Sequence, residues 1–363
     1  MKALDPSYQV LYSELIQRSL DAAFESDFSL NGRFVRVTAQ NRSYWYFDMS
    51  GEDGKKVRRY VGQADDANIN SRVENFKTLK ADYRARRKLV STLVREAYLP
   101  SPPPKVGAVV QAMADAGFFR LRGVLVGTVA FQCYSAGLGI RLPGAMLQTG
   151  DADFAQFHSI SVAVEDSMPD MVSVLQRVDP TFRPVPRLNP KELPSQLASR
   201  DGYKVDFLTP NTGTDDYAGK ATPMPALGNI AAEPLRFLDF LIYEPVRAVL
   251  LYGAGIPVLV PAPERYAIHK LIVATRRLND DNGRDKRQKD MRQAEILMQA
   301  MIATSQMVPL ADAFIEAWQR GQSWRSAIAQ SLGALPSATD IKARLAEGVV
   351  ILGHKPEDFD LVG

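Results

Sequence analysis

Three consecutive prolines interrupt the chain in the sequence SPPPK, residues 101–105. Each proline fixes its backbone φ angle at about −65° and lacks an N–H donor, so neither a helix nor a central strand continues through the segment. Consecutive prolines also keep the backbone extended and semi-rigid. We therefore expect separate units on the two sides: an N-terminal α+β module over residues 1–100, a core over residues 105–262, and a helical region over residues 263–363.

The composition allows a large apolar core and excludes several kinds of site. Hydrophobic residues make up 46% of the 363 positions and charged residues 23%, which is ordinary for a globular enzyme. Cys133 is the only cysteine, so the chain can form neither an internal disulfide nor a cysteine-based zinc site, and we expect it to be a small core residue. Because there are only three histidines, we expect any metal to be a hard cation bound by carboxylates.

The sequence also bears on where the protein is found. The first residues, MKALDPSYQVLYSEL, lack the continuous apolar segment of a signal peptide. The longest apolar stretch, Val246–Val260, is interrupted by Arg247 and Pro257, so we do not expect it to span a membrane. We therefore expect a cytoplasmic protein. Its net charge of +3 is compatible with phosphate-bearing partners without requiring them.

Before the prolines, turn signals and apolar spacing predict a helix, three strands and a second helix. Asp5-Pro6 is typical of a helix start with Asp5 as the N-cap, and the helical spacing of apolar residues continues to about Phe24. The Asp53-Gly54 pair is typical of a hairpin turn. The predicted strands are residues 33–38, 43–49 and 55–61, and the predicted second helix, which is rich in charge, is residues 69–99.

Aromatic side chains alternate with cations on these strands. The aromatic residues are Tyr44, Trp45, Tyr46 and Tyr60, and the cations are Arg33, Arg36, Arg42, Lys55, Lys56, Arg58 and Arg59. Such a surface can stack bases and contact phosphates. An ordinary sheet with its aromatic residues in a core has the same pattern, and we favour that interpretation. Together with the basic cluster Arg84–Lys88, the pattern makes nucleic-acid contact through this hairpin a second hypothesis.

After the prolines, short strands and helices alternate until about residue 262, and only helices follow. This order predicts an α+β or mixed α/β fold, with flanking helices around a mixed sheet and a helical C-terminal part. The predicted core strands are residues 121–126, one or two strands within 150–164, and then 203–208, 246–251 and 257–260. The predicted helices are residues 106–116, 128–136, 168–177, 264–278, 284–304, 310–320 and 341–347.

The segment RGVLVGTVAF, residues 122–131, predicts a buried strand that continues directly into a helix. Gly127 allows the backbone to turn tightly and approach a ligand, and Thr128 is a suitable N-cap. The free N–H groups at such a helix start can bind a phosphate. An ordinary strand–helix junction explains the same residues, because a lone glycine motif is weak.

Three aspartates lie in predicted strands. In QTGDADF, residues 148–154, Asp151 and Asp153 are two positions apart at a strand start, so both carboxylates point to the same side. Asp206 lies in the strand YKVDFLT, where burying a charge is costly unless it is paired or bound to a metal. An acidic turn and a solvated edge strand are the simpler interpretations. If the two strands are neighbours, the carboxylates converge and can hold two Mg²⁺ ions.

The order of these motifs resembles that of the DNA polymerase β-like nucleotidyltransferase superfamily. Its members carry a Gly-Ser or Gly-Gly pair at a strand–helix turn, then a D-x-D or D-x-E pair, and then a lone Asp on a later strand. Within it the chain is similar to bacterial proteins with a nucleotidyltransferase fold and an uncharacterised role, through YWYFDMSGEDGKKVRRYVG, LVGTVAFQCY…TGDADF and VPAPERYAIHKLIVATRR…KRQKD. Thr128 departs from the usual second Gly or Ser, and the spacing to Asp151 implies an inserted loop near residues 137–148.

This resemblance implies a polymerase β-like core and an enzyme that uses Mg²⁺, or Mn²⁺ in its place, to transfer an NMP from an NTP to an acceptor hydroxyl. Pyrophosphate would be released. The implied catalytic and metal-binding residues are Asp151, Asp153 and Asp206. The implied nucleotide-binding residues are Gly127, Thr128, Lys270 and Lys289, with Lys286 and Asp290 as further candidates. For the charged helix residues, a solvated helix face is the alternative interpretation.

The resemblance does not identify the acceptor, which could be the 3′ end of an RNA, a protein side chain or a small molecule. Two alternatives do without catalysis. The chain could be a silent nucleic-acid-binding module that kept the fold, or a component of a toxin–antitoxin or defence complex. Three intact aspartates favour catalysis, because a binding protein has no need to gather negative charge where a phosphate binds.

Overall fold

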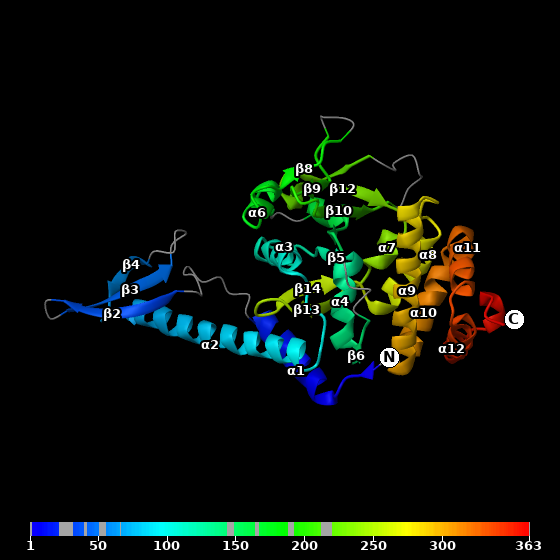
Figure 1. The fold of residues 1–363 in the computed structure, drawn as a ribbon, viewed down its shortest axis with the longest axis horizontal. Coiled ribbons are helices and arrows are strands. Elements are labelled where there is room, and N and C mark those ends of the chain that lie inside the picture. The colour runs from blue at the N-terminus through cyan, green and yellow to red at the C-terminus, as the bar shows by residue number, and fades with distance from the viewer. Residues whose placement is uncertain are drawn as a thin grey trace.

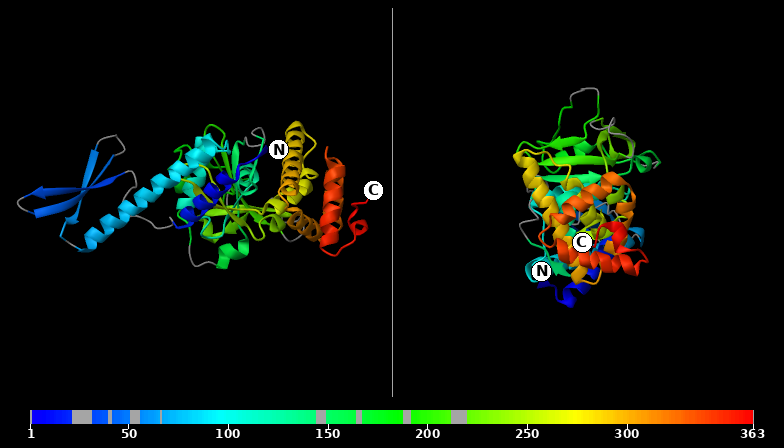
Figure 2. Two further views of the ribbon diagram at one scale, coloured as in Figure 1. Left: turned by 90° about the horizontal axis from the view of Figure 1, so that it is seen from below. Right: turned by 90° about the vertical axis from the view of Figure 1, so that its right-hand side faces the viewer.

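The structure, a computed structural model, describes residues 2–21, 32–39, 42–50, 56–65, 67–143, 149–163, 167–187, 192–211 and 220–362. Within them the molecule has two parts, as Figure 1 shows. An arm made of three strands and a long helix projects from a larger body that contains the other elements. Figure 2 shows the same projection from below.

The helices are α1 (Pro6–Asp21), α2 (Ala67–Arg95), α3 (Pro104–Asp115), α4 (Gly127–Gly137), α5 (His158–Ala163), α6 (Met171–Gln176), α7 (Leu238–Leu241), α8 (Pro263–Ala274), α9 (Asp281–Ala303), α10 (Met307–Gln319), α11 (Gln322–Gly333) and α12 (Ala338–Ile351), with the 3-10 turns η3 (Pro225–Leu227) and η4 (Pro356–Phe359). The strands are β1 (Lys2–Ala3), β2 (Arg33–Ala39), β3 (Arg42–Ser50), β4 (Lys56–Gln63), β5 (Val124–Val126), β6 (Ile140–Arg141), β7 (Asp151–Ala155), β8 (Arg183–Pro184), β9 (Gln196–Ala198), β10 (Lys204–Pro210), β11 (Thr222–Met224), β12 (Ile230–Leu235), β13 (Val246–Leu250) and β14 (Ile256–Val260).

The arm is an antiparallel sheet, β2–β3–β4, packed on the first turns of α2. Phe34, Phe47 and Phe76 form its small core, with ring centroids 4.9 to 5.7 Å apart. The predicted strands and long helix are therefore confirmed. The predicted hairpin turn at residues 51–55 lies outside the described residues, as do the side chains of Tyr44 and Tyr60.

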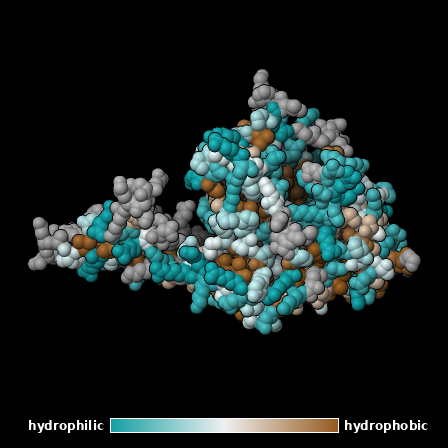
Figure 3. Space-filling view, in the orientation of Figure 1, coloured by the Kyte–Doolittle hydropathy of each residue, from teal (hydrophilic) through white to brown (hydrophobic). Residues whose placement is uncertain are grey.

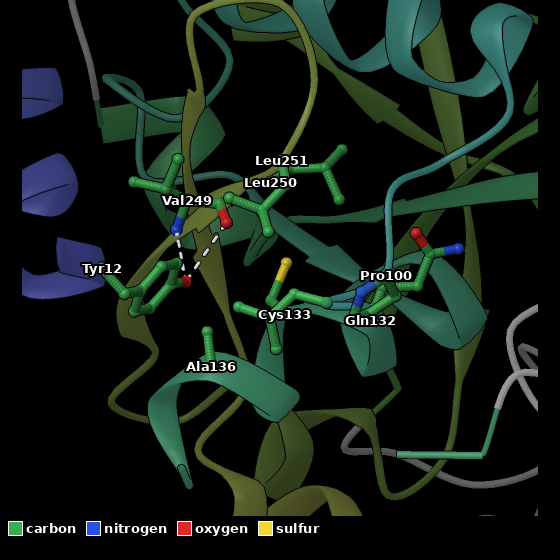
Figure 4. Close-up of a pocket in the computed structure, with 9 residues that line it drawn as sticks. Tyr12, Pro100, Gln132, Cys133, Ala136, Val249, Leu250 and Leu251 are labelled. Atoms are coloured by element: carbon green, nitrogen blue, oxygen red, sulfur yellow. Dashed lines mark hydrogen bonds between the residues drawn. The ribbon is translucent and has the colours of Figure 1, made fainter. Parts of the chain in front are cut away.

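Helix α1 and the second half of α2 join the arm to the body. The predicted N-cap of α1 is confirmed, because Asp5 Oδ1 accepts a hydrogen bond of 2.9 Å from the backbone N–H of Ser7. The Tyr12 hydroxyl accepts a hydrogen bond of 3.0 Å from Val249 N and donates one of 3.2 Å to Val249 O. Figure 4 shows the small hollow beside this contact, which Cys133 also lines. As expected, Cys133 is buried and free.

The central sheet of the body has seven strands, in the order β11-β12-β10-β7-β5, with β8 and β9 joined beside β10. Strands β7, β10 and β12 run parallel, whereas β5 and β11 pair antiparallel to their neighbours. Phe154 and Phe207, from adjacent strands, are fully buried with ring centroids 6.2 Å apart. The expected mixed α+β architecture is confirmed, while the three-part division at residues 100 and 262 stays a prediction.

One predicted strand is wrong. The residues after β7 form the short helix α5, not the continuation of a strand. Although Ile160 and Val162 favour strands, Val162 is 60% exposed, and the buried Ser161 hydroxyl accepts a 3.0 Å hydrogen bond from Ala226 N. This tertiary contact overrides the local preference.

Helices α8 to α12 form one side of the body, on the right in Figure 1. Their apolar faces belong to the same core as the central sheet. The predicted C-terminal helices are confirmed, with α11 as an additional one. Within the described ranges, no helix combines the length and apolarity needed to cross a bilayer.

Candidate active site

The strand–helix turn at Gly127 lies as the sequence predicts, at the end of β5 and the start of α4. Gly127 has a φ of +65°, in the left-handed region that favours glycine. The predicted N-cap is wrong. Helix α4 begins at Gly127 itself, after Val126, so no side chain caps it, and Thr128 lies buried in the first turn. The N–H groups of this turn are therefore not satisfied by a capping side chain.

The three predicted aspartates come together. Strands β7 and β10 are parallel neighbours in which Asp153 pairs with Asp206, and β5 places Val126 beside Asp153 on the other edge. Asp151 lies two residues before Asp153 and shares its face. One carboxylate oxygen from each aspartate lies within 4.8 Å of the others. The register therefore builds an acidic triad directly beside the Gly127 turn.

Gly127 and Asp153 are in close contact. A Cβ atom added at Gly127 would overlap Oδ2 of Asp153. Any side chain at this position would push the carboxylate away or move the turn. The glycine is thus required both by its φ angle and by the closeness of the acidic triad.

We expect Gly127→Ala to weaken both folding and Mg²⁺ binding. A left-handed φ costs an L-residue about 1–2 kcal/mol, and displacement of Asp153 adds a loss of metal affinity of roughly tenfold or more. Gly253→Ala is the matched control, because Gly253 has a φ of +60° and no atom within 4 Å of its added Cβ. Thermal melting with and without Mg²⁺ measures both effects. Equal Mg²⁺-dependent shifts in the two variants would contradict the contact with Asp153.

The triad is electrostatically unfavourable without a cation. Burial, together with the charges of Asp151 and Asp206, raises the pKa of Asp153 to about 7. Burial likewise raises the pKa of Asp206, and the charge of Asp151 adds to that shift. The donor set consists of carboxylate oxygens, which Mg²⁺ prefers. The residues therefore fit a hard divalent cation, which would relieve their repulsion.

We expect Asp153→Asn to stabilise the metal-free protein at pH 8. Between about pH 4 and pH 7, Asp153 keeps its proton in the folded wild type, whereas it has lost that proton in the unfolded chain. The stability of the wild type therefore falls as pH rises through that range. The side chain of Asp153→Asn does not titrate, so the stability of this variant does not fall in that range. It should melt roughly 5 °C higher than wild type at pH 8 in EDTA, with a smaller difference at pH 5. Melting curves at the two pH values measure it. A variant that melts lower than wild type at pH 8 would contradict the repulsion.

Two neighbouring side chains orient the triad, and both were missed in the sequence. Gln196, on β9 opposite Asp206, donates a hydrogen bond from Nε2 to Asp206 Oδ1. The Thr149 hydroxyl donates to Asp151 Oδ1. Thr149 precedes the D-x-D motif directly and could have been noticed. Gln196 could not, because only the pairing of β9 with β10 brings it to the site.

Lys270 does not stand alone at the site. Its ammonium group binds Asp290 Oδ1 at 2.6 Å, and Arg277 binds the other oxygen of Asp290 at 2.7 Å. Burial alone would lower the pKa of Lys270. Its electrostatic interactions with Tyr266 and Asp290 and its hydrogen bond to Asp290 outweigh burial, so the pKa of Lys270 is raised. The charges of Lys270 and Arg277 act on Asp153 and oppose the rise of its pKa. The cluster of Lys270, Arg277 and Asp290 thus carries a net positive charge that acts on the triad.

Tyr266 connects this cluster with the glycine turn. Its hydroxyl lies 3.0 Å from Gly127 O and 3.0 Å from Gln293 Oε1, and the Lys270 ammonium lies 5.2 Å from its ring centroid. Tyr266 and Lys270 are four residues apart and therefore share a face of α8. That spacing was visible in the sequence. The contact with Gly127 was not, because it depends on how α8 packs against α4.

Lys289 and Lys286 lie on α9 and interact electrostatically with the triad. Burial lowers the pKa of the half-buried Lys289, while the charges of Asp151 and Asp153 counteract that shift. The exposed Lys286 acts electrostatically on Asp206. Both lysines are therefore near the carboxylates. The nucleotide-binding roles of Lys270 and Lys289 stay predictions.

The comparisons with known proteins agree with this geometry. A model of the family described as Nucleotidyltransferase matches residues 104–319, which is more than half of the chain. The chain belongs to the nucleotidyltransferase family. This nucleotidyltransferase is accordingly a transferase, and its mixed α+β body is consistent with the fold of the family. No curated protein and no solved structure matches the chain significantly.

Proposed function

We propose that this nucleotidyltransferase binds Mg²⁺ through Asp151, Asp153 and Asp206 and transfers an NMP from an NTP to an acceptor hydroxyl. The observation that carries the proposal is the convergence of three carboxylates within 4.8 Å beside the Gly127 turn. The family match supports nucleotidyl transfer in general. A silent binding module has no use for this repulsive triad.

The chemistry is an in-line displacement at the α-phosphorus. The acceptor oxygen forms a bond to the α-phosphorus, the bond from that phosphorus to the bridging oxygen breaks, and pyrophosphate leaves. A divalent cation, when bound, supplies the positive charge that offsets the charge developing on the phosphate. The residues of the chain must position the triphosphate and the acceptor and must remove the proton of the attacking hydroxyl.

Named residues can do this. The uncapped N–H groups at the start of α4 would bind a phosphate of the nucleotide, because a helix N-terminus attracts anions. Lys289 would neutralise phosphate charge from α9. Gln196 occupies Oδ1 of Asp206, so Oδ2 is the oxygen that would accept the proton of the attacking hydroxyl.

Label transfer tests this proposal. The full chain is incubated with each of the four NTPs, labelled at the α-phosphate, with Mg²⁺ or Mn²⁺ and with total RNA, lysate proteins or small metabolites. We expect label in one of these fractions and release of pyrophosphate. No incorporation with any nucleotide in any fraction would contradict the proposal. A Mg²⁺-dependent rise of the melting temperature with a non-hydrolysable NTP is a simpler first measurement.

A further inference from the structure

Charge is distributed very unevenly along this chain. Residues 32–95, which contain the strands and long helix of the arm, carry 15 Lys and Arg against 7 Asp and Glu. The remaining residues carry 29 Lys and Arg against 34 Asp and Glu. The arm is therefore strongly positive, whereas the rest of the chain carries a net negative charge. It also lies outside the residues 104–319 that match the family, so the family match does not account for it.

The cations of α2 form a stripe along one face. Five cations of this helix lie on the same side, because they are spaced by three, four or seven residues apart from one adjacent pair. They are Lys80, Arg84, Arg87, Lys88 and Arg95. We call them the basic stripe. It extends over about 22 Å, at 1.5 Å per residue. Four of the five side chains are exposed, and Figure 3 shows hydrophilic surface along this helix.

The opposite face of α2 is occupied and fixes the stripe in place. Val90 and Leu93 are buried in the cluster that joins α2 to the body. Arg86, which is not part of the stripe, binds Asp82 at 2.9 Å and donates to Ala254 O at 3.3 Å. The helix cannot therefore rotate to bury its cations. The basic stripe is held toward solvent.

The stripe has no acidic partner of its own. Arg84, Arg87, Lys88 and Arg95 make no ion pair within the described parts of the chain. Lys80 donates to Gly32 O, and its pKa is lowered by burial and then by the positive charges of Arg84 and Arg33. Like charges gathered without a counter-charge repel one another, so a bound polyanion would stabilise them.

The side chains of the neighbouring sheet indicate which class of polyanion would bind there. Arg58, which is ion-paired with Asp48, lies over the Tyr46 ring at 5.8 Å, and Trp45 is hydrogen-bonded to Asn70 at the start of α2. Aromatic rings of the sheet therefore lie beside a cation and beside the helix that carries the basic stripe. Aromatic side chains next to cations suit exposed bases on a single strand. Helix α2, among its described side chains, exposes no large apolar residue that could enter a membrane. Single-stranded nucleic acid engages both the cations and the rings, whereas the charge of an acidic protein matches the cations alone.

We propose that the basic stripe and the adjoining sheet bind single-stranded RNA and that this RNA carries the acceptor hydroxyl. The second half of this proposal rests on the proposed function, whereas the first half does not. The arm would hold the RNA backbone, and the triad in the body would modify a hydroxyl of the same molecule.

Binding is tested separately from catalysis. Fluorescence anisotropy with a labelled single-stranded RNA of about 20 nucleotides compares wild type with the variant Arg84→Gln/Arg87→Gln/Lys88→Gln. We expect at least tenfold weaker binding at low salt. The slope of log K against log salt should fall by about 2, because each phosphate contact on a single strand contributes about 0.7. The matched control is Arg200→Gln/Arg247→Gln/Lys355→Gln, which removes the same amount of charge at exposed positions outside the arm. Its affinity for the RNA should lie within twofold of wild type.

Each result decides between the two proposals. Equal affinity and salt slope in the stripe variant and wild type would overturn the basic stripe as the RNA site. Duplex DNA or polyglutamate that competes as strongly as RNA would overturn RNA as the partner. RNA binding that is retained in Asp206→Asn supports the stripe independently of the triad. RNA binding without any nucleotidyl transfer would leave the stripe in place and contradict the proposed function alone.

Discussion

Asp206→Asn should lower nucleotidyl transfer by roughly 10²–10⁴-fold while leaving the protein folded. Loss of a carboxylate that would hold the cation and accept the proton of the attacking hydroxyl costs several kcal/mol of transition-state stabilisation, and each 1.4 kcal/mol is a factor of ten in rate. Asparagine keeps the oxygen that accepts the hydrogen bond from Gln196. It also removes one of the charges that raise the pKa of Asp153. We therefore expect a melting temperature equal to or above that of wild type in EDTA.

The combination of lost activity and retained stability is what distinguishes a catalytic carboxylate from a structural one. The matched control is Asp312→Asn, which makes the same change at an exposed position on α10 and should keep full activity. Initial rates of label incorporation at saturating NTP and Mg²⁺ provide the measurement. A rate for Asp206→Asn within tenfold of wild type would show that two aspartates suffice.

The sequence was informative where one strand could be interpreted alone. The alternation in β7 and the apolar neighbours of Asp206 correctly placed the carboxylates on strands. Their convergence depended on strand order, which the pairing of β7 with β10 confirms. Register was not readable, because a shift of one residue would turn Asp206 to the other face. The pairing of Asp153 with Asp206 could come only from the structure.

The sequence-based predictions were wrong or incomplete where contacts between segments far apart in the sequence determine the local structure. Helix α5 is held through Ser161 against Ala226 from another segment, a contact that no local pattern shows. The start of α4 differs from prediction because Gly127, with its left-handed φ, is itself the first residue of the helix, which leaves Thr128 inside the first turn. Lys270 was correctly placed on a helix, but its pairing with Asp290 depends on the packing of α8 against α9.

That pairing leads to the largest expected effect on stability. Asp290 is 3% exposed and binds both Lys270 and Arg277. In Asp290→Ala, the ammonium of Lys270 stays buried without its carboxylate, whereas the partly exposed Arg277 can turn toward water. Removal of one partner of a buried pair costs about 3–5 kcal/mol. We expect a melting temperature lower by roughly 10 °C, measured by calorimetry or circular dichroism.

A double variant separates the structural role of this pair from its role at the site. Lys270→Met/Asp290→Leu removes both charges and should recover most of the lost stability, because apolar residues of similar volume can replace a buried pair. It should not recover nucleotidyl transfer, since the Lys270 ammonium, the larger of the two positive charges that act on Asp153, is gone and only Arg277 remains. A double variant as unstable as Asp290→Ala would show that shape and not charge pairing dominates there. One that regains full activity would mean that Lys270 serves only to hold α8 and α9 together.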